Sequence, residues 1–262
     1  VIVQDIATHP NWALYSELAS RAGLGACWSQ PILSPSRQVL GTFAIYHRDK
    51  HGPTEADIYV IEQSARLASI AIERKQMEDE VRKLAFYDAL TELPNRRLLA
   101  DRLKQALAAS KRKGLYGALL FLDLDNFKPL NDQHGHDYGD LLLKEVARRI
   151  RSCVREVDTV ARFGGDEFVV VLSELVADKT ASATQASMVA EKIRSALAAP
   201  YLLSIRHEDS PETSVEHHCT SSIGAVLFGK QESSASDILK WADLAMYQAK
   251  AAGRNTVKFY DA

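Results

Sequence analysis

Two apolar segments joined by a pair of glycines constrain the fold of this chain more than any other feature. The glycines are Gly164 and Gly165, and the segment after them includes Phe168–Leu172, which is apolar throughout. Adjacent glycines adopt the positive φ angles of a tight turn, so the two segments are predicted to pair as an antiparallel hairpin. The surrounding sequence alternates between strand-like and helix-like patterns. A hairpin within that alternation predicts a mixed sheet covered by helices.

The region around this hairpin begins after Pro94 and extends to the end of the chain. Its apolar residues change repeatedly between the helical and the extended spacing. Residues 206–214 are polar and are predicted to form a surface loop. The helices are predicted at about 95–112, 139–152, 181–198 and 235–251, and the strands at about 116–124, 158–163, 167–172, 218–228 and 256–260.

The first part of the chain has a different pattern, with short elements separated by turns. Ala26–Ile32 and Val39–Tyr46 are mainly apolar, and the turn residues Ser34–Arg37 lie between them. This arrangement predicts a second β-hairpin. Thr54 then precedes a segment with acidic residues in its first turn, which is typical of a helix N-terminus.

A helical pattern follows Thr54 and continues to about residue 85. Its apolar residues recur at the alternating spacing of three and four that forms the seam of a coiled coil. The spacing changes near residue 75, so the seam is predicted to shift there. Two interpretations are an amphipathic helix packed on its own domain and a connector in a parallel dimer; the length and the absence of Gly and Pro favour the connector. The seam residues are Ile58, Ile61, Ala65, Ala68 and Ile72, followed by Met77, Val81 and Leu84.

Charge and cysteine content exclude several classes of protein. The chain has 32 Lys and Arg against 34 Asp and Glu, which gives no support for binding a nucleic acid polymer. Its 3 cysteines form no paired motif, so we expect a reducing cytoplasm and no disulfide scaffold. No apolar run reaches the ~20 residues of a membrane span. The chain starts at Val1 rather than Met, and we expect it to be a fragment of a longer protein.

Carboxylates follow both the glycine turn and the end of another apolar strand. Asp166 and Glu167 come directly after the glycines, and Asp123 and Asp125 end the apolar run that begins at Ala118. Carboxylate oxygens, together with substrate phosphates, are the ligands that Mg²⁺ prefers. We therefore expect a divalent-cation site. Asp123 and Asp166 are the preferred pair, because a turn after the strand would direct Asp125 elsewhere.

The segment Arg162–Phe168 resembles the signature loop of the GGDEF family, the diguanylate cyclases. Further motifs of that family occur in the same order along this chain, and the resemblance covers about residues 86–262. One departure is Glu92, where the family usually has glycine in the segment that leads into the domain. The other matching segments are Asp88–Arg97, Phe127–Asp132, Gly135–His136, Gly139–Asp140, Ser222–Gly224 and Ala249–Asn255.

This resemblance implies an α+β fold with a mainly antiparallel five-stranded sheet wrapped by helices, like that of nucleotidyl cyclases and polymerase palms. It implies a homodimeric enzyme of the bacterial cytoplasm that condenses two GTP into cyclic di-GMP and two pyrophosphates. Each 3′-hydroxyl would attack the α-phosphate of the nucleotide on the other subunit. The alternatives are a catalytically inactive receptor for GTP or cyclic di-GMP and a dimerisation module without catalysis. The complete set of motif residues disfavours both.

The resemblance also implies a catalytic loop and a metal site. Mg²⁺, with Mn²⁺ as an alternative cation, is implied to bind Asp123, Asp166 and the backbone carbonyl of Leu124. Either carboxylate of the signature loop is a candidate for the general base. The implied catalytic residues are Gly164, Gly165, Asp166 and Glu167.

Further residues are implied to bind nucleotides. Asn131 and Asp140 match the pair that reads guanine, because a carboxylate accepts hydrogen bonds that adenine cannot donate. Arg155 and Asp158 match an inhibitory RxxD site for the cyclic product, and Arg suits such bidentate recognition. The alternative is that these two residues are a solvated helix end. The residues implied to lie near the phosphates are Asn126, Phe127, Lys128, Lys250 and Arg254.

The N-terminal segment carries a second resemblance. Gly25–Ile32 and Gly41–Tyr46 are similar to the C-terminal half of a GAF sensor domain. The predicted organisation is therefore a partial GAF domain at 1–57, a signalling helix or coiled-coil connector at 58–85 and a GGDEF catalytic domain at 86–262.

Overall fold

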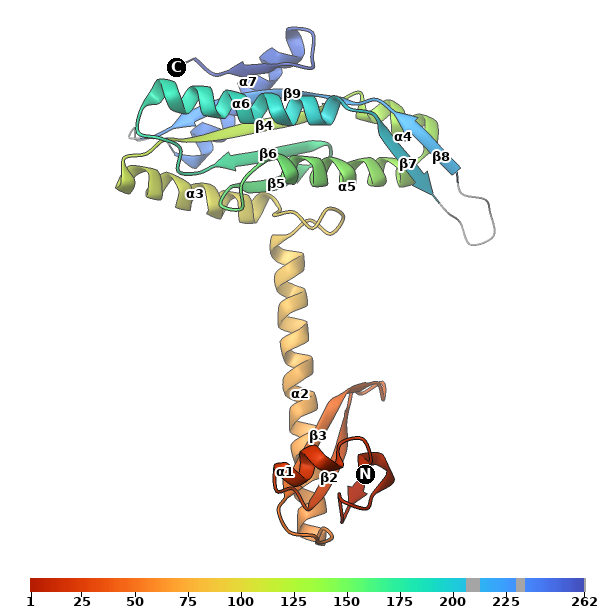
Figure 1. The fold of residues 1–262 in the computed structure, drawn as a ribbon. Coiled ribbons are helices and arrows are strands. Elements are labelled where there is room, and N and C mark those ends of the chain that lie inside the picture. The colour runs from red at the N-terminus through yellow and green to blue at the C-terminus, as the bar shows by residue number, and fades with distance from the viewer. Residues whose placement is uncertain (206–212, 230–233, 262) are drawn as a thin grey trace. The chain divides into compact units, whose positions relative to one another are not determined.

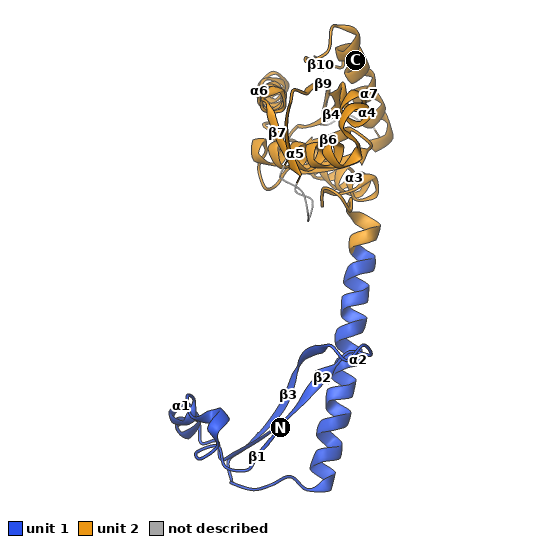
Figure 2. Ribbon diagram, turned by 90° about the vertical axis from the view of Figure 1, so that its right-hand side faces the viewer, with its two compact units in different colours: residues 1–82 blue, residues 83–262 orange. Residues whose placement is uncertain are grey.

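The computed structural model describes residues 1–205, 213–229 and 234–261 (Figure 1). The chain divides into two compact units, residues 1–82 and residues 83–262, which Figure 2 draws in different colours. Each unit has its own sheet and its own apolar core. No helix in the described part of the chain is long and apolar enough to cross a lipid bilayer.

The first unit contains a three-stranded antiparallel sheet in the order β1-β2-β3. Strands β2 and β3 pair along most of their length, which confirms the hairpin predicted from the sequence. A 3₁₀ turn and the short helix α1 lie between β1 and β2. The bounds are β1 Ile2–Val3, the 3₁₀ turn Pro10–Trp12, α1 Ser16–Arg21, β2 Ala26–Leu33 and β3 Val39–His47.

Helix α2 spans Glu55–Phe86 and begins where the sequence predicts. The backbone N–H and hydroxyl of Thr54 donate to the carboxylate of Asp57, and the Asp57 N–H donates to the Thr54 hydroxyl. This reciprocal cap satisfies backbone donors that a helix otherwise leaves open at its N-terminus.

One apolar stripe of α2 is covered within the first unit. Ile61 and Ala65 are buried, and the hydroxyl of Ser69 donates to the backbone carbonyl of Leu33, 2.7 Å away. The prediction that this stripe is a seam between two chains is therefore wrong for Ile61 and Ala65. This part of α2 matches the other interpretation, an amphipathic helix packed on its own domain.

The second unit is built on a five-stranded sheet in the order β10-β9-β4-β6-β5. Every neighbouring pair is antiparallel except β9 and β10, which are parallel. The predicted α+β class with a mainly antiparallel sheet is thus confirmed. The strands are β4 Gly117–Asp125, β5 Thr159–Gly164, β6 Glu167–Leu172, β9 Thr220–Phe228 and β10 Val257–Phe259.

Helices cover both faces of this sheet. The first face carries α5 (His136–Cys153) and α6 (Lys179–Ala198), and the second carries α3 (Arg96–Lys113) and α7 (Ala235–Ala251). Figure 2 shows α6 and α7 on opposite sides of the strands. Strand β4 lies in the middle of the sheet and is buried along its whole length. Its carboxyl end can therefore carry polar residues that are shielded from bulk water.

Three elements of this unit were not predicted. Helix α4 (Phe127–His134) has Pro129 in its first turn, where the missing N–H would be unpaired in any case. Strands β7 (Tyr201–Ile205) and β8 (Thr213–His217) form a separate antiparallel pair. The predicted surface loop at 206–214 lies mostly outside the described residues, and its last two residues belong to β8.

Candidate active site

The two acidic clusters predicted from the sequence meet at the end of β4. Asp123 on β4 lies opposite Glu167 on β6 in the antiparallel ladder. The backbone N–H of Leu124 donates to the carbonyl of Asp166 over 3.3 Å. Sheet register, rather than closeness in sequence, therefore places the turn between β5 and β6 beside the last residues of β4.

The side chain of Arg162 holds the glycine turn in place. Its guanidinium donates twice to the carbonyl of Gly165, over 3.0 and 2.8 Å, and also contacts the carboxylate of Asp88. Gly165 has a φ of +50°, a conformation that other residues adopt only with strain. These contacts fix the turn and so position Asp166 and Glu167, which follow it.

The electrostatic environment at the end of β4 is strongly negative. Burial raises the pKa of Asp123, and the nearby charges of Asp166 and Asp125 raise it further, although Lys250 acts in the opposite direction. Burial also raises the pKa of Glu167, and the carboxylates of Asp123 and Asp166 reinforce the effect. Several carboxylates here thus oppose one another's ionisation, and a bound cation would relieve that repulsion.

The donor set fits a hard divalent cation that brings its own additional ligands. Asp123 and Asp166 offer carboxylate oxygens, which such cations prefer. Within residues 1–205, 213–229 and 234–261, no three His, Cys, Asp or Glu side chains are placed to hold a metal ion by themselves. This arrangement suits Mg²⁺, which usually keeps several waters and takes one or two carboxylates together with substrate phosphates.

Asp125 has a different role from Asp123. Strand β4 continues through Asp125, so the expected break in the strand comes one residue later than predicted. The Asp125 carboxylate accepts hydrogen bonds from Thr220 (2.7 Å), Ser222 (2.8 Å) and the backbone N–H of Asn255 (3.1 Å). These contacts tie the segment after α7 to the sheet and leave Asp125 little capacity to bind a cation.

Two cationic side chains, one in the last turn of α7 and one just after it, approach the end of β4. The ammonium of Lys250 lies 2.7 Å from the Asp123 carboxylate. The guanidinium of Arg254 lies 4.0 Å from Asp125 and is largely exposed. The structure therefore places Lys250 beside the predicted metal ligand Asp123, and Arg254 near Asp125 on the same strand.

The N-terminus of α4 lies directly after β4. Asn126 has a φ of +62° and turns the chain from the strand into the helix that starts at Phe127. The first N–H groups of a helix have no partner within it and attract anions. The predicted phosphate-binding residues Asn126, Phe127 and Lys128 thus follow the acidic end of β4 without an intervening loop.

Asn131 on α4 is one of several described residues with a buried polar atom that lacks a hydrogen-bond partner. Its side-chain oxygen is buried and has no hydrogen-bond partner. A Cβ atom at Gly139 on α5 would collide with this oxygen, so glycine at position 139 leaves the space that the Asn131 side chain occupies. Asp140, the other predicted guanine reader, is the next residue and is exposed.

The predicted inhibitory residues lie together after α5. The Arg155 guanidinium lies 3.3 Å from the Asp158 carboxylate and donates to the carbonyl of Ser173 over 2.9 Å. Asp158 is buried and also accepts the backbone N–H of Ser173 over 3.1 Å. Arg155 lines a groove of about 740 Å³ that includes two further guanidinium groups, those of Arg102 and Arg151.

A sequence model of the family described as "Diguanylate cyclase, GGDEF domain" matches residues 85–256. The chain belongs to the GGDEF family. A second model, described as "GAF domain", matches residues 1–73, so both resemblances stated from the sequence are confirmed.

Curated relatives support the GGDEF assignment. "Bifunctional diguanylate cyclase/cyclic di-GMP phosphodiesterase MucR" of Pseudomonas aeruginosa is 41% identical over 197 residues, 75% of this chain and 27% of that protein. "Diguanylate cyclase A" of Treponema denticola is 35% identical over 211 residues, 79% of this chain and 52% of that protein. The chain thus spans about a quarter of the first relative and half of the second.

Solved GGDEF structures agree with this fold. The GGDEF domain of PA1120 (TpbB or YfiN) from Pseudomonas aeruginosa has a TM-score of 0.56 at 38% identity, covering 67% of this chain and 94% of that one. The coiled coil and GGDEF domain of DgcB from Caulobacter crescentus, in complex with cyclic di-GMP, has a TM-score of 0.61 at 28% identity. That match covers 75% of this chain and 98% of the DgcB chain.

Sequence reasoning missed several residues that organise the GGDEF site. Thr220 and Asn255 anchor Asp125, and Arg162 anchors the signature turn to Asp88. Asn255 and Arg162 lie inside the recognised motifs, so motif membership was the available signal. Thr220 has no such signal, because its contact with Asp125 arises only from the pairing of β4 with β9.

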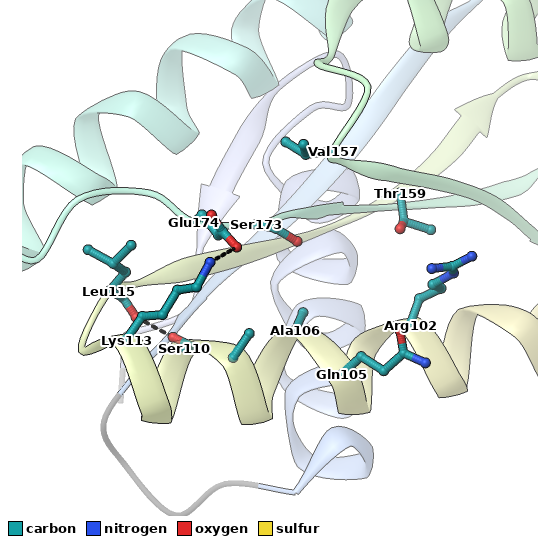
Figure 3. A pocket seen from close by; sticks show the side chains of 11 residues that line it. Arg102, Gln105, Ala106, Ser110, Lys113, Leu115, Val157, Thr159, Ser173 and Glu174 are labelled. Carbon is teal, nitrogen blue, oxygen red and sulfur yellow. Dashed lines mark hydrogen bonds and ion pairs between the residues drawn. The ribbon is translucent and has the colours of Figure 1, made fainter.

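A separate small cavity in the GGDEF unit contains none of the predicted site residues. It measures about 190 Å³ and lies between α3 and the strands β5 and β6 (Figure 3). Figure 3 shows Lys113 directed toward Glu174 at one end of the cavity, and these two side chains form an ion pair. Because the acidic residues at the end of β4 lie outside its lining, we assign this cavity no part in catalysis.

Proposed function

We propose that this chain is a diguanylate cyclase that condenses two GTP into cyclic di-GMP and two pyrophosphates as a homodimer. One observation carries the proposal: the ladder register pairs Asp123 with Glu167, while Lys250 contacts Asp123 from α7. The carboxylates that would bind a cation and the ammonium group that would bind phosphate thereby lie together at one end of the buried strand β4. Phosphoryl transfer relies mainly on such positioning and charge stabilisation.

The metal site proposed here uses Asp123, Asp166 and the Leu124 carbonyl, with Mg²⁺ as the cation and Mn²⁺ as the alternative. When bound, the cation acts as a Lewis acid on the phosphoryl oxygens. Lys250 then exchanges the Asp123 carboxylate for a phosphate oxygen of the nucleotide. Arg254 adds a second positive charge, and both groups neutralise the charge that builds up on the departing pyrophosphate.

The proposed chemistry is an attack of one 3′-hydroxyl oxygen on the α-phosphorus of the GTP held by the other subunit. A bond forms between that oxygen and the α-phosphorus, and the bond from the α-phosphorus to the β-phosphate oxygen breaks. Asp166 or Glu167 accepts the hydroxyl proton, and the raised pKa of Glu167 makes its carboxylate a stronger base than usual. Repeating the step on the second GTP closes the ring.

Nucleotide choice is proposed to depend on Asn131 and Asp140. The unpartnered oxygen of Asn131 would accept a donor, and the Asp140 carboxylate would accept from the guanine N1–H and exocyclic amine. Adenine lacks donors at these positions, so a polar group left unpaired would disfavour ATP. Arg155 and Asp158 are proposed to bind the cyclic product and so limit its accumulation.

The remaining parts are proposed to regulate this activity. Residues 1–57 would act as part of a GAF sensor, residues 58–85 as the connector and residues 86–262 as the catalytic domain. The bacterial cytoplasm is the proposed location, since it supplies GTP and Mg²⁺.

A second candidate is a receptor that binds GTP or cyclic di-GMP without turnover. The relative named "Cyclic di-GMP phosphodiesterase NbdA", from Pseudomonas aeruginosa, is 36% identical over 200 residues, and its name mentions no cyclase activity. A matching GGDEF region therefore does not by itself establish turnover.

One experiment separates these candidates. The full chain is incubated with GTP and Mg²⁺, with ATP in a parallel sample, and the products are identified by mass spectrometry. We expect cyclic di-GMP from GTP, no cyclic product from ATP, and no product from the Asp166→Asn, Glu167→Gln double variant. Binding of GTP without any product would establish the receptor instead.

A further inference from the structure

Two histidines of the first unit lie against each other between the end of the sheet and the start of helix α2. His47 is the last residue of β3, and His51 follows it by four residues, before the helix begins at Glu55. Their rings are nearly perpendicular, with centroids 4.7 Å apart. Neither histidine belongs to the GGDEF unit or to the segments that carry the GAF resemblance.

The ring of His51 is oriented so that one nitrogen stays free. Its Nδ1 lies 3.0 Å from the backbone carbonyl of Asp49. Because a carbonyl oxygen only accepts hydrogen bonds, Nδ1 carries the proton, and Nε2 of the neutral ring keeps its lone pair. A backbone carbonyl on the other ring nitrogen is a usual orienting partner of a histidine that binds a metal ion.

His47 also has a nitrogen without a partner. Its Nε2 atom is buried, and no hydrogen bond reaches it within the described part of the chain. A polar atom that is kept from water and has no protein partner destabilises the fold. A ligand that engages this nitrogen would remove that cost.

Trp28 packs against both imidazole rings. Its ring centroid lies 4.2 Å from that of His47 and 5.1 Å from that of His51. Trp28 is 2% exposed, and its indole N–H likewise has no hydrogen-bond acceptor. Two of the three rings in this cluster therefore carry a buried nitrogen without a partner, and a metal ion with bound water would supply a partner for each.

We propose that His47 and His51 bind a divalent transition-metal ion, for which Zn²⁺ is the probe. Imidazole nitrogens prefer ions such as Zn²⁺, Ni²⁺ and Cu²⁺, whereas Mg²⁺ and Ca²⁺ prefer oxygen ligands. Two histidines with three residues between them are also a spacing found in zinc sites. Water molecules complete the coordination of the ion, and one of them accepts the N–H of Trp28.

The protein supplies two ligands to this site. Among residues 1–205, 213–229 and 234–261, no three His, Cys, Asp or Glu side chains are grouped to hold a metal ion. Asp57, in the first turn of α2, already accepts hydrogen bonds from the N–H and the hydroxyl of Thr54. With two protein ligands the ion is held reversibly, so occupancy follows the concentration of free ion.

The bound ion joins the end of β3 to the segment that leads into α2. Thr54, which caps the helix, lies three residues after His51. A ligand that binds only the folded state stabilises that state by mass action, so the ion stabilises the first unit. The proposal goes beyond the proposed function, because it concerns a ligand of the first unit and needs no turnover of GTP.

The first test is a calorimetric titration of the full chain with Zn²⁺ under excess Mg²⁺. We expect a Zn²⁺ site that Mg²⁺ does not displace and whose affinity falls at least tenfold with His51→Gln. His51 is exposed, so its replacement disturbs little packing. The matched control is His218→Gln, which removes an exposed histidine of the second unit and should change nothing. Absence of Zn²⁺ binding, or an isotherm that His51→Gln leaves unchanged, overturns the proposal.

The second test locates the ion by tryptophan emission. Cu²⁺ quenches indole fluorescence at short range, and Trp28 contacts both histidine rings. We expect Cu²⁺ to lower the emission of the unaltered chain, and most of this loss to disappear with Trp28→Phe and with His51→Gln. The other tryptophans, Trp12 and Trp241, remain in both variants. Equal quenching with Trp28→Phe would place the ion elsewhere and overturn the proposal.

The third test concerns the identity of the ligands. We expect the His51-dependent affinity to rise from Co²⁺ to Ni²⁺ to Cu²⁺, the order that nitrogen sites follow, and Ca²⁺ not to bind there. A site that prefers Ca²⁺ would consist of oxygen ligands and would overturn the proposal. Zn²⁺ binding that depends on His51 in a chain without cyclase activity would overturn the proposed function alone. Cyclase activity without such binding would overturn the metal site alone.

Discussion

The ammonium of Lys250 lies 2.7 Å from the carboxylate of Asp123 and joins the last turn of α7 to the end of β4. Both side chains are largely shielded, with exposures of 31% and 12%. Each is therefore the principal charge partner of the other before nucleotide binds. Under the proposed function, arrival of a cation and a triphosphate together would let both residues change partners without leaving either charge alone.

Asp123→Asn tests this exchange. The substitution keeps the side-chain size but removes the charge needed to hold a divalent cation against water, and we expect turnover to fall by at least about 100-fold. Pyrophosphate release at saturating GTP and Mg²⁺ measures it. Asp243→Asn is the matched control, since Asp243 is exposed on α7 and its charge reaches Glu167 without belonging to the proposed ligand set. An equal loss in both variants would show that only local charge matters.

Gly139→Ala tests the position of Asn131. The added methyl would collide with the Asn131 oxygen, so the side chain must move away from its buried position. We expect the KM for GTP to rise about 10- to 100-fold, as a loss of roughly 1–3 kcal/mol of polar recognition predicts. Steady-state kinetics of Gly139→Ala, Asn131→Ala and the double variant form a cycle. The double variant should be no worse than Asn131→Ala, and full additivity would place the effect of Gly139 elsewhere.

The ion pair between Asp88 and Arg162 should make stability depend on pH. Burial by itself would raise the pKa of Asp88, but hydrogen bonds from Thr91 and Arg162 outweigh it and hold the pKa below its usual value. An Asp with a lowered pKa in the folded state stabilises the protein above its ordinary pKa, about 3.9, and this contribution is lost as pH falls through the folded pKa.

Urea unfolding of Asp88→Asn at pH 7 and near pH 3.5 measures this contribution. At pH 7 we expect the free energy of unfolding to decrease by about 1–3 kcal/mol, because Arg162 loses a charged partner. Near pH 3.5 the difference from the unaltered protein should shrink. Asp101→Asn, on the exposed side of α3, should change little at either pH. A difference that stays constant with pH would exclude Asp88 ionisation as the cause.

The fold was predictable where local pattern and tertiary structure agree. Strands β4, β6 and β9 are long apolar runs, and their burial in the middle of the sheet follows from that composition. Helix α4 escaped detection because it is short and contains Pro129, and β8 because its side chains are mostly polar. These elements are stabilised by tertiary contacts, which the local sequence pattern does not show.

Residues of the site could be predicted only where they lie in recognised sequence motifs. The sequence could place Asp123 and Asp125 at one strand end but could not show that Asp125 is already bonded to Thr220, 95 residues later, and Asn255, 130 residues later. Likewise, the sequence shows the apolar residues of α2 but not which of them their own unit covers. The burial of Ile61 and Ala65 assigns these two residues to the first unit.

Glu92→Gly tests a motif position at which this chain has glutamate where the family usually has glycine. Glu92 has a φ of +56°, the conformation that glycine adopts without strain. We expect the substitution to increase the free energy of unfolding by about 0.5–1 kcal/mol, measured as a higher urea midpoint. Glu156→Gly is the comparison, because Glu156 is not among the positive-φ residues and glycine there should destabilise. A decrease in the free energy of unfolding with Glu92→Gly would mean that the Glu92 side chain stabilises the fold by more than the backbone strain at this position destabilises it.

We expect Arg155 and Asp158 to have different roles, although their side chains form an ion pair. Asp158 is 2% exposed and accepts backbone N–H groups from Arg155 (3.0 Å) and Ser173 (3.1 Å), whereas Arg155 is 56% exposed. Asp158 therefore organises the loop, whereas the exposed guanidinium of Arg155 is proposed to exchange its contacts for a phosphate in the groove that Arg102 and Arg151 also line. Both substitutions to alanine should relieve inhibition by cyclic di-GMP.

Only Asp158→Ala should also destabilise the fold, by about 1–3 kcal/mol, because it removes the acceptor of the backbone N–H groups of Arg155 and Ser173. Initial rates of pyrophosphate release with and without added cyclic di-GMP measure inhibition, and urea unfolding measures stability. Arg148→Ala, which removes an exposed arginine of α5 from outside the groove, should change neither. If Arg155→Ala remained as strongly inhibited as the unaltered protein, its guanidinium would serve only to hold Asp158 and Ser173, and the groove would not be the site of product binding.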